Sequence, residues 1–457
     1  MPKADSPVSQ PIAMAEVGLQ VKSLHKTSEA LSTALAAAKE RFSARNPNSK
    51  KIFEGACDFL PGGNTRTLLY TAPFPVCMKK GEAYQVFDED GHVYTDFVGE
   101  LTAALYGHSH PLIQKSLIST IQSIGLNLGA TIQQENVHAK LICERFNLSK
   151  IRFCNSGTEA NLHALAGARR FTGKRKVVVF YGAYHGAVLG FWDGVQENGV
   201  DKAEWVIGRY NDIEGAKHLI EQDDIAAVLV EGMQGAGGCI SGTNEFLLQL
   251  QTSAKKAGAM FILDEVMTSR LGPGGLQAIV GLSPDITTLG KYLGGGLAFG
   301  AFGGRADIMA VYDPRSANSL AHSGTFNNNT LAMYAGHVGL SEIWTPSVAV
   351  EFNKRGDAFR AKLQAVTAGT KMSVTGMGAL NAVHFSEDGK TEIACSDDIS
   401  EDWGLKDLFF LEMMEDSFWI TRRGSIALML PTPDSEMDRF VECVGRFLQR
   451  HKDLVAL

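Results

Sequence analysis

The hydrophobic positions near the start of the chain follow the period of a helix. They recur at intervals of four, three and four residues, at Leu31, Leu35, Ala38 and Phe42. We expect this helix to stop near Pro47. Short alternating runs through Tyr84–Val98 predict a small sheet, whereas residues 1–25, which mix proline, serine and small residues without periodicity, are expected to form a mobile arm.

Between residues 110 and 335 the pattern changes to apolar runs rich in β-formers, most of them separated by helical stretches. The runs are Ile151–Phe153, Val177–Phe180, Ala226–Val230, Met260–Leu263 and Thr287–Leu289. Because their hydrophobicity is continuous rather than alternating, we expect strands that are covered on both faces. Strands separated by helices need crossover connections, so the pattern predicts a mostly parallel sheet.

Beyond about residue 340 the chain predicts helices, a pair of strands around Leu380–Phe385 and Ser425–Leu430, and a final helix. That helix is expected to start near Asp434 or Ser435 and to turn four side chains inward, those of Phe440, Val444, Phe447 and Leu448. We therefore expect a large α/β domain over residues 110–335. Residues 26–109 and 336–457 would pack together as a smaller α+β domain.

Composition narrows the class of protein. Apolar residues make up 45% and charged residues 20%, as in ordinary globular proteins. A net charge of −7 argues against a nucleic-acid partner. The seven cysteines form no C-x-x-C pair, which predicts a reducing compartment and no zinc site. No apolar run suits a signal peptide or a membrane helix, so we expect a cytoplasmic protein with no membrane partner.

Two charged residues follow predicted strands, where ligands of α/β sheets bind. Asp264 ends the run AMFILD, and it could be a metal ligand, a general base, a partner for a protonated ring nitrogen, or only a helix cap or surface acid. Lys291 stands in TTLGKYLGGG. It precedes its glycines, so the order of a phosphate-binding P-loop is absent. A surface lysine is one interpretation, and an amine that forms a Schiff base beside bare backbone is the other.

Three further strand ends carry polar or aromatic groups. Ser156, Gly157 and Thr158 open a predicted helix, and this arrangement suits a phosphate or a simple capping box. Tyr184, beside His185, could stack on a planar ring or belong to the core. Glu231 and Gln234 follow another strand and could meet a ring hydroxyl.

These motifs, NSGTEA, YHG, VEGMQG, LDEVMT and LGKYLGGG, occur in an order and spacing that resembles the class III aminotransferases, which depend on pyridoxal 5′-phosphate (PLP). The similarity covers roughly residues 50–450. AFGGRADIM and SGTFNNN resemble the glutamate-1-semialdehyde aminomutase branch, and PGGNTR, APFP and TRRG most resemble the β-phenylalanine (aromatic β-amino acid) aminotransferases. The resemblance implies fold type I: a large, mostly parallel, seven-stranded type of sheet with helices on both faces, plus a smaller α+β domain.

The resemblance also implies roles for the cofactor residues. Lys291 would hold PLP as a Schiff base and move the proton between the substrate carbon and the cofactor, and Asp264 would keep the ring nitrogen protonated. The phosphate would bind Ser156, Gly157 and Thr158, joined by Thr325 from a second subunit of a homodimer. The ring would lie between Tyr184 and Val266, with Glu231 and Gln234 near its hydroxyl. The family's usual Glu-Pro is Glu231-Gly232 here.

For the substrates, the resemblance implies that Arg66 and Arg423 hold carboxylates, which suits the planar fork of arginine. Surface arginines without a ligand are the alternative, and Arg422 is a neighbouring candidate. The resulting hypothesis is an aminotransferase that passes nitrogen, through pyridoxamine phosphate, from an amino acid such as an aromatic β-amino acid to 2-oxoglutarate or pyruvate. An isomerase on the same scaffold (an aminomutase or an amino-acid epimerase) and a non-catalytic binding protein are the alternatives.

Overall fold

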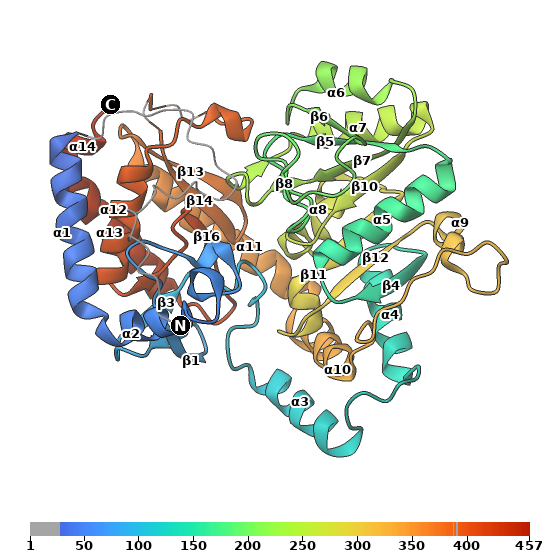
Figure 1. Cartoon of the computed structure of the whole chain (residues 1–457), viewed down its shortest axis with the longest axis horizontal. Helices are drawn as coiled ribbons and strands as arrows, with labels where there is room; N and C mark the ends of the chain where they lie inside the picture. The colour runs from blue at the N-terminus through green and yellow to red at the C-terminus, as the bar shows by residue number, and fades with distance from the viewer. Residues whose placement is uncertain (1–27, 387, 390–391) are drawn as a thin grey trace, which may run out of the picture.

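The structure is a computed structural model that describes residues 28–386, 388–389 and 392–457, so the arm expected over residues 1–25 lies outside the described residues. Figure 1 shows two bodies side by side. One holds a large sheet with its helices, and the other combines the first elements of the chain with the last ones. No helix in these described ranges has the length and apolarity needed to cross a bilayer.

The large sheet has seven strands. Their spatial order is β4 (Lys150–Cys154), β12 (Gly300–Gly304), β11 (Ile286–Gly290), β10 (Met260–Asp264), β7 (Ile225–Glu231), β5 (Lys176–Phe180) and β6 (Trp205–Gly208). β12 runs antiparallel to both of its neighbours, and the other pairs are parallel. The mostly parallel sheet predicted from the apolar runs is therefore confirmed, and each of the five runs is one of its strands.

Helices cover both faces of this sheet, as its doubly apolar strands require. Val178 and Val228 pack on one face with α6 (Ile213–Ile220), α7 (Asn244–Ala257) and α8 (Gly275–Val280). On the other face, Val177 and Ala227 pack with α5 (Gly157–Thr172) and α9 (Ala306–Met309). This burial of apolar surface on both sides holds the strand ends at one edge of the sheet.

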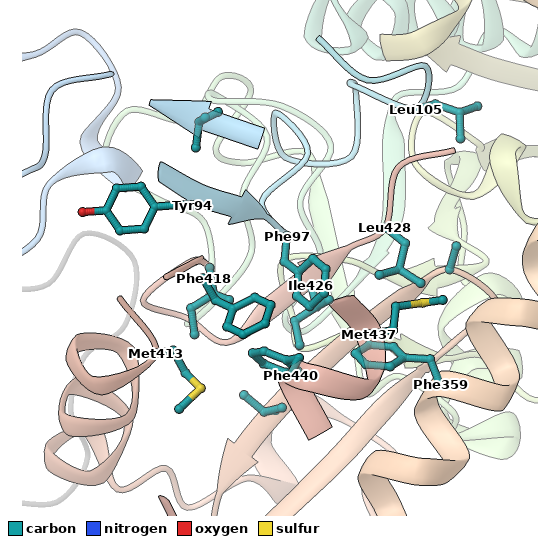
Figure 2. Packing of buried hydrophobic residues seen from close by; sticks show 14 of the residues in the cluster. Tyr94, Phe97, Leu105, Phe359, Met413, Phe418, Ile426, Leu428, Met437 and Phe440 are labelled. Carbon is teal, nitrogen blue, oxygen red and sulfur yellow. The ribbon is translucent and has the colours of Figure 1, made fainter. Parts of the chain in front are cut away.

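The second body joins distant parts of the chain. β1 (Met78–Glu82), β2 (Gln85–Asp88) and β3 (Val93–Asp96) form a sheet with β15 (Phe418–Trp419), which lies parallel to β3. A second sheet contains β13 (Met372–Met377), β14 (Leu380–Phe385) and β16 (Ser425–Ala427). Figure 2 shows the core between them, in which the ring centroid of Phe97 lies 5.4 Å from that of Phe418 and 5.0 Å from that of Phe440.

The remaining elements connect or cover these sheets. The helices of the second body are α1 (Glu29–Arg45), α2 (Pro47–Ala56), α11 (Pro346–Thr367), α12 (Trp403–Glu415), α13 (Asp434–Arg450) and α14 (Lys452–Val455). α10 (Thr330–Val338) packs against both α3 (Pro111–Ser123) and α4 (Gln133–Arg145), and the hairpin of β8 (Met233–Gln234) and β9 (Ile240–Ser241) packs against β13 of the second body. α10 runs across residues 335–336, where a domain boundary was expected, and the boundaries themselves stay predictions.

Several predicted elements are present with small differences. The first helix stops before Pro47 as expected, but Pro47 opens a second helix, since proline needs no intrahelical acceptor there. The last helix begins at Asp434 and buries its four predicted side chains. The final strand is shorter than Ser425–Leu430 and ends at Ala427.

Candidate active site

The carboxyl ends of the large sheet open on a cavity of about 800 Å³. Five strand ends supply residues that line it: Ser156 after β4, Tyr184 after β5, Glu231 on β7, Asp264 on β10 and Lys291 after β11. The second body closes the opposite side with the turn before β16 and the segment after β3. A cavity of this size is typical of small-molecule sites.

Asp264 presents a buried carboxylate that is fixed by three donors. Its Oδ2 accepts from Asn161 Nδ2 at 2.8 Å and lies 2.8 Å from His185 Nδ1. Its Oδ1 accepts from the backbone N–H of Val266 at 2.9 Å. The residue is only 4% exposed, so the carboxylate has one fixed orientation at the wall of the cavity.

Lys291 begins a short 3-10 turn, η4 (Lys291–Gly294), with a left-handed φ of 59°. Its Nζ donates to the carbonyl oxygen of Leu101 at 3.0 Å and to Thr102 Oγ1 at 2.5 Å. Burial lowers the pKa of this amine to about 8, although the carboxylates of Asp264 and Glu231 act in the opposite direction. A lowered pKa favours the neutral amine, which is the form that attacks an aldehyde carbon.

The N-terminus of α5 forms the anion-binding end of the cavity. Ser156 caps the helix by accepting from Glu159 N at 3.2 Å, and the N–H groups of Gly157 and Thr158 stand in the first turn, where no intrahelical acceptor is available. A Cβ on Gly157 would lie 2.9 Å from the methyl carbons of Val266, so only glycine leaves the observed space. All four of Ser156, Gly157, Thr158 and Val266 line the cavity.

Tyr184 and Glu231 are tied together at the rim of the sheet. The backbone N–H of Tyr184 donates to Glu231 Oε1 at 2.9 Å, and the Tyr184 ring stacks on Trp192 with centroids 5.8 Å apart. Burial, assisted by the charge of Asp264, raises the pKa of Glu231 to about 7. Gly232, where the family carries proline, lies against Leu276, whose Cδ2 would stand 2.2 Å from an added Cβ. Close packing against Leu276 therefore explains why glycine stands here in place of the family's proline.

Gln234 is not brought into the cavity. It is fully buried in β8, and its Nε2 donates to the carbonyl oxygen of Tyr181 at 2.9 Å. It does not line the cavity that contains Glu231. Its predicted place beside a ring hydroxyl therefore has no direct geometric support.

The two adjacent arginines before β16 point to different places. Arg423 lines the cavity, where burial lowers its pKa although the Cys239 thiol and the Tyr184 phenol act in the opposite direction. Among the described residues its guanidinium donates no hydrogen bond, so the planar fork is available to a ligand in the cavity. Arg422 instead pairs with Asp407 and lies 5.4 Å from the ring centroid of Trp403.

Arg66 and Thr325 lie outside the cavity. Arg66 is exposed and forms an ion pair with Glu100, a residue that does line the cavity, so its guanidinium sits just beyond the rim. Thr325 stands in an exposed turn and lines a separate hollow of about 440 Å³ together with Phe326. Its predicted contact with a second copy of the chain stays a prediction.

Sequence reasoning overlooked the residues that hold Asp264 and Lys291. Asn161 stands on the buried face of α5 between Ala160 and Ala164, and an amide at such a position was a usable signal. His185 was noted without a role, but its ring fixes one oxygen of Asp264. For Thr102, in an irregular segment, the sequence offered no comparable signal.

The residues present fit PLP. An acceptor-only carboxylate suits a protonated ring nitrogen, and the N-terminus of α5, whose first N–H groups line the cavity, suits a phosphate. The amine of Lys291, with its lowered pKa, suits the cofactor's aldehyde. His185 Nε2, buried and without a partner among the described residues, marks this part of the wall as polar.

Comparisons with known proteins agree with this geometry. The model of the protein family "Aminotransferase class-III" matches residues 70–432. The chain is 46% identical over 435 residues to a β-phenylalanine transaminase of Variovorax paradoxus, covering 94% of this chain and 99% of that protein. The crystal structure of that β-phenylalanine aminotransferase superposes with a TM-score of 0.91, covering 93% of this chain and 99% of that one.

Two other proteins extend the comparison. A glutamate-1-semialdehyde 2,1-aminomutase of Acetivibrio thermocellus is 32% identical over 425 residues, covering 88% of this chain and 98% of that protein. A transaminase solved with PLP bound is 27% identical, with a TM-score of 0.80 and coverage of 89% and 98%. The chain belongs to the class III aminotransferases and is a PLP-dependent transaminase of fold type I.

Proposed function

We propose that this transaminase takes the amino group from a β-amino acid with an aromatic side chain and passes it to 2-oxoglutarate or pyruvate. The observation that carries the proposal is Arg423, a guanidinium facing the cavity beside Tyr184. Both substrates have a carboxylate that such a fork can bind bidentately. The 46% identity to a protein named β-phenylalanine transaminase supports the choice of donor.

Apolar side chains around the same cavity suit an aromatic group. The lining includes Leu68, Ile113, Leu117, Met267, Leu380 and Ile426. Because these residues come from both bodies, a bound donor would be enclosed between them. Burial of an aromatic ring against such a wall is favourable, while the carboxylate is held at the polar end near Arg423.

The other residues divide the remaining work. PLP, when bound, carries the nitrogen and withdraws electrons from the donor carbon. Ser156, Gly157 and Thr158 would hold its phosphate, and Asp264 would keep a proton on its ring nitrogen. Lys291 would take the proton from the donor carbon and return it during transfer, a task that requires its neutral amine.

We further propose a homodimer in which Thr325 reaches the phosphate site of the other copy. Exposed apolar side chains support it: Ile118 and Ile121 of α3 are 55% and 52% exposed, and Phe326, beside Thr325, is 54% exposed. Ile118 and Ile121 stand three residues apart on one side of α3, and apolar side chains grouped in this way favour a surface that a partner covers. The seven cysteines, all free, are in keeping with the cytoplasm as the proposed location.

A donor panel tests the proposal. β-Phenylalanine should bleach the visible band of the loaded enzyme, and added 2-oxoglutarate or pyruvate should restore it and gain the nitrogen. An aromatic amine that lacks a carboxylate should react much more slowly. If that amine reacts equally well, the carboxylate site is wrong.

The isomerase alternative rests on the aminomutase relative at 32% identity. It predicts that the nitrogen stays on the carbon skeleton of the donor. Isotope-labelled donor nitrogen that never appears in the 2-oxo acid product, together with isomerised or racemised donor, would therefore replace the proposed transfer.

A further inference from the structure

The turn after β3 has an unusual backbone. Gly99, Glu100, Leu101 and Thr102 all have left-handed φ values, of 51°, 48°, 52° and 79°. For non-glycine residues this region costs roughly 1 kcal/mol or more each, and the cost is greatest for a β-branched residue such as threonine. Three successive residues of this kind need a structure that compensates for the strain.

Two buried side chains hold the turn. Asp96 Oδ1 accepts from the N–H groups of Val98 at 2.7 Å and Gly99 at 3.0 Å. Arg270 donates to the carbonyl oxygen of Thr102 at 2.9 Å and to that of Leu428 at 2.5 Å. Arg270 is 1% exposed and donates to both carbonyls, so a buried charge fixes the position of the turn.

The turn presents two different groups to Lys291. The carbonyl oxygen of Leu101, 3.0 Å from Nζ, can only accept a hydrogen bond. The hydroxyl of Thr102, 2.5 Å from Nζ, can accept from the amine or donate to its lone pair. The pair therefore suits an amine that alternates between its charged and neutral forms.

We propose that the turn formed by Gly99–Thr102 is a dock for the free amine of Lys291, and that Thr102 is a positioning residue for proton transfer at the donor carbon. The proposal rests on the assignment of Lys291 as the cofactor lysine. During transfer the neutral amine takes one proton from the donor carbon and becomes an ammonium group. It then gives one proton to the cofactor carbon, so protons balance and no electron acceptor is needed.

Geometry makes the dock useful at that step. A long lysine side chain has many rotamers, and an amine that must meet one carbon gains rate when it is held in place. Both docking groups come from the second body, whereas Lys291 comes from the large sheet. The position of the amine therefore depends on how the second body is placed against the large sheet.

Thr102→Val and Thr102→Ser test the role of the hydroxyl. Valine keeps the branched shape and its strain but removes the hydroxyl, whereas serine keeps the hydroxyl. We expect Thr102→Val to slow donor-induced bleaching about 10–100-fold, the loss of one hydrogen bond to a charged group, with KM nearly unchanged. The isotope effect with a donor deuterated at the reacting carbon should rise, and Thr102→Ser should stay within a few-fold of the wild type.

Borohydride reduction of each loaded variant tests the assignment of Lys291 as the cofactor lysine separately from the role of the turn. The reduced cofactor should be attached to Lys291 in the wild type and in both variants. Attachment to another lysine would overturn the assignment of Lys291 and the dock together. Attachment at Lys291, combined with wild-type rate and isotope effect in Thr102→Val, would overturn the dock alone.

Two further results bear on the hydroxyl. Equal slowing in Thr102→Val and Thr102→Ser would contradict a role for it. If Thr102→Val does not fold, Thr102→Ala compared with Thr102→Ser removes the same hydroxyl without branching, and equal rates in that pair would also overturn the dock.

Discussion

Substituting Asp264 by asparagine creates a conflict that the surrounding hydrogen bonds cannot relieve. Asn161 Oδ1 accepts from the Thr288 hydroxyl at 2.8 Å, and its Nδ2 also donates to the carbonyl oxygen of His185 at 3.0 Å. This fixes the Nδ2 of Asn161 toward Asp264. An asparagine at 264 must then turn its oxygen to Asn161 and its NH₂ to the backbone N–H of Val266, which loses its acceptor.

Asp264→Asn should lower two quantities, the free energy of unfolding and the protonated fraction of the cofactor ring. A fully buried donor left without an acceptor costs about 1–3 kcal/mol, and the N–H of Val266 is part-buried, so we expect the free energy of unfolding to fall by about 1 kcal/mol, the low end of that range. A neighbouring opposite charge shifts a pKa by about 1–3 units, at 1.36 kcal/mol per unit. Losing the carboxylate should therefore reduce the protonated ring of the cofactor by about 10–1000-fold, and turnover with it.

Two measurements on Asp264→Asn check these values separately. Urea unfolding of the cofactor-free protein reports the lost acceptor of Val266, and the single-turnover rate of donor bleaching reports the lost charge. Near-normal turnover would mean that another acid protonates the ring. An unchanged free energy of unfolding would mean that the fixed orientation of Asn161 is wrong.

Three other predictions concern separate parts of the molecule. The rate at which the cofactor-free protein recombines with PLP should rise with pH and level off above about 8, because the neutral amine of Lys291 increases as pH passes its lowered pKa; a rate still rising steeply at pH 10 would contradict this. Arg423→Ala should weaken 2-oxoglutarate binding by about 2–5 kcal/mol, tens- to thousands-fold, with an unchanged cofactor spectrum, whereas Arg422→Ala, whose side chain pairs with Asp407, should change binding far less. Equal effects in calorimetric titrations would refute that distinction. Phe326→Asp should shift the proposed dimer toward monomer in sedimentation and lower activity, and unchanged sedimentation would exclude this surface from the interface.

The sequence predicted the strand-end residues well because local signals define them. Asp264 and Lys291 each stand at the end of a short run rich in apolar and β-branched residues, and runs of this length and composition favour strands buried on both faces. Parallel strands bring their carboxyl ends to one edge, so the cavity followed from the order of the elements. No knowledge of side-chain packing was needed for that step.

β12 shows where the same reasoning failed. Its sequence, GAFGG, carries no apolar run, yet it lies between β4 and β11. A Cβ on Gly300 would stand 2.1 Å from the carbonyl oxygen of Ser156, and one on Gly304 would stand 2.1 Å from that of Asp285. The glycines are there for close packing, a tertiary requirement that overrides strand propensity.

Arg422 and Arg423 mark the limit of motif reasoning within the site. Sequence alone favoured one of two adjacent arginines but had no physical means to separate them. In the structure, Arg422 pairs with Asp407 and lies over the ring of Trp403, both of which belong to α12. Arg423 instead lines the cavity. The two adjacent arginines have different surroundings because Asp407, which is distant in the sequence, forms an ion pair with only one of them.

The position of Thr102 depends on residues that are far apart in the sequence. Lys291 lies 189 residues from Thr102, and Arg270 lies 168 residues from it, so no local pattern could join the three. The strained turn and the buried guanidinium are each unfavourable when considered alone. Together they make physical sense, since the charge of Arg270 fixes the carbonyl of Thr102 and thereby the hydroxyl that receives the lysine. A strand end determines where the amine stands, and a turn from the other body determines which groups it meets there.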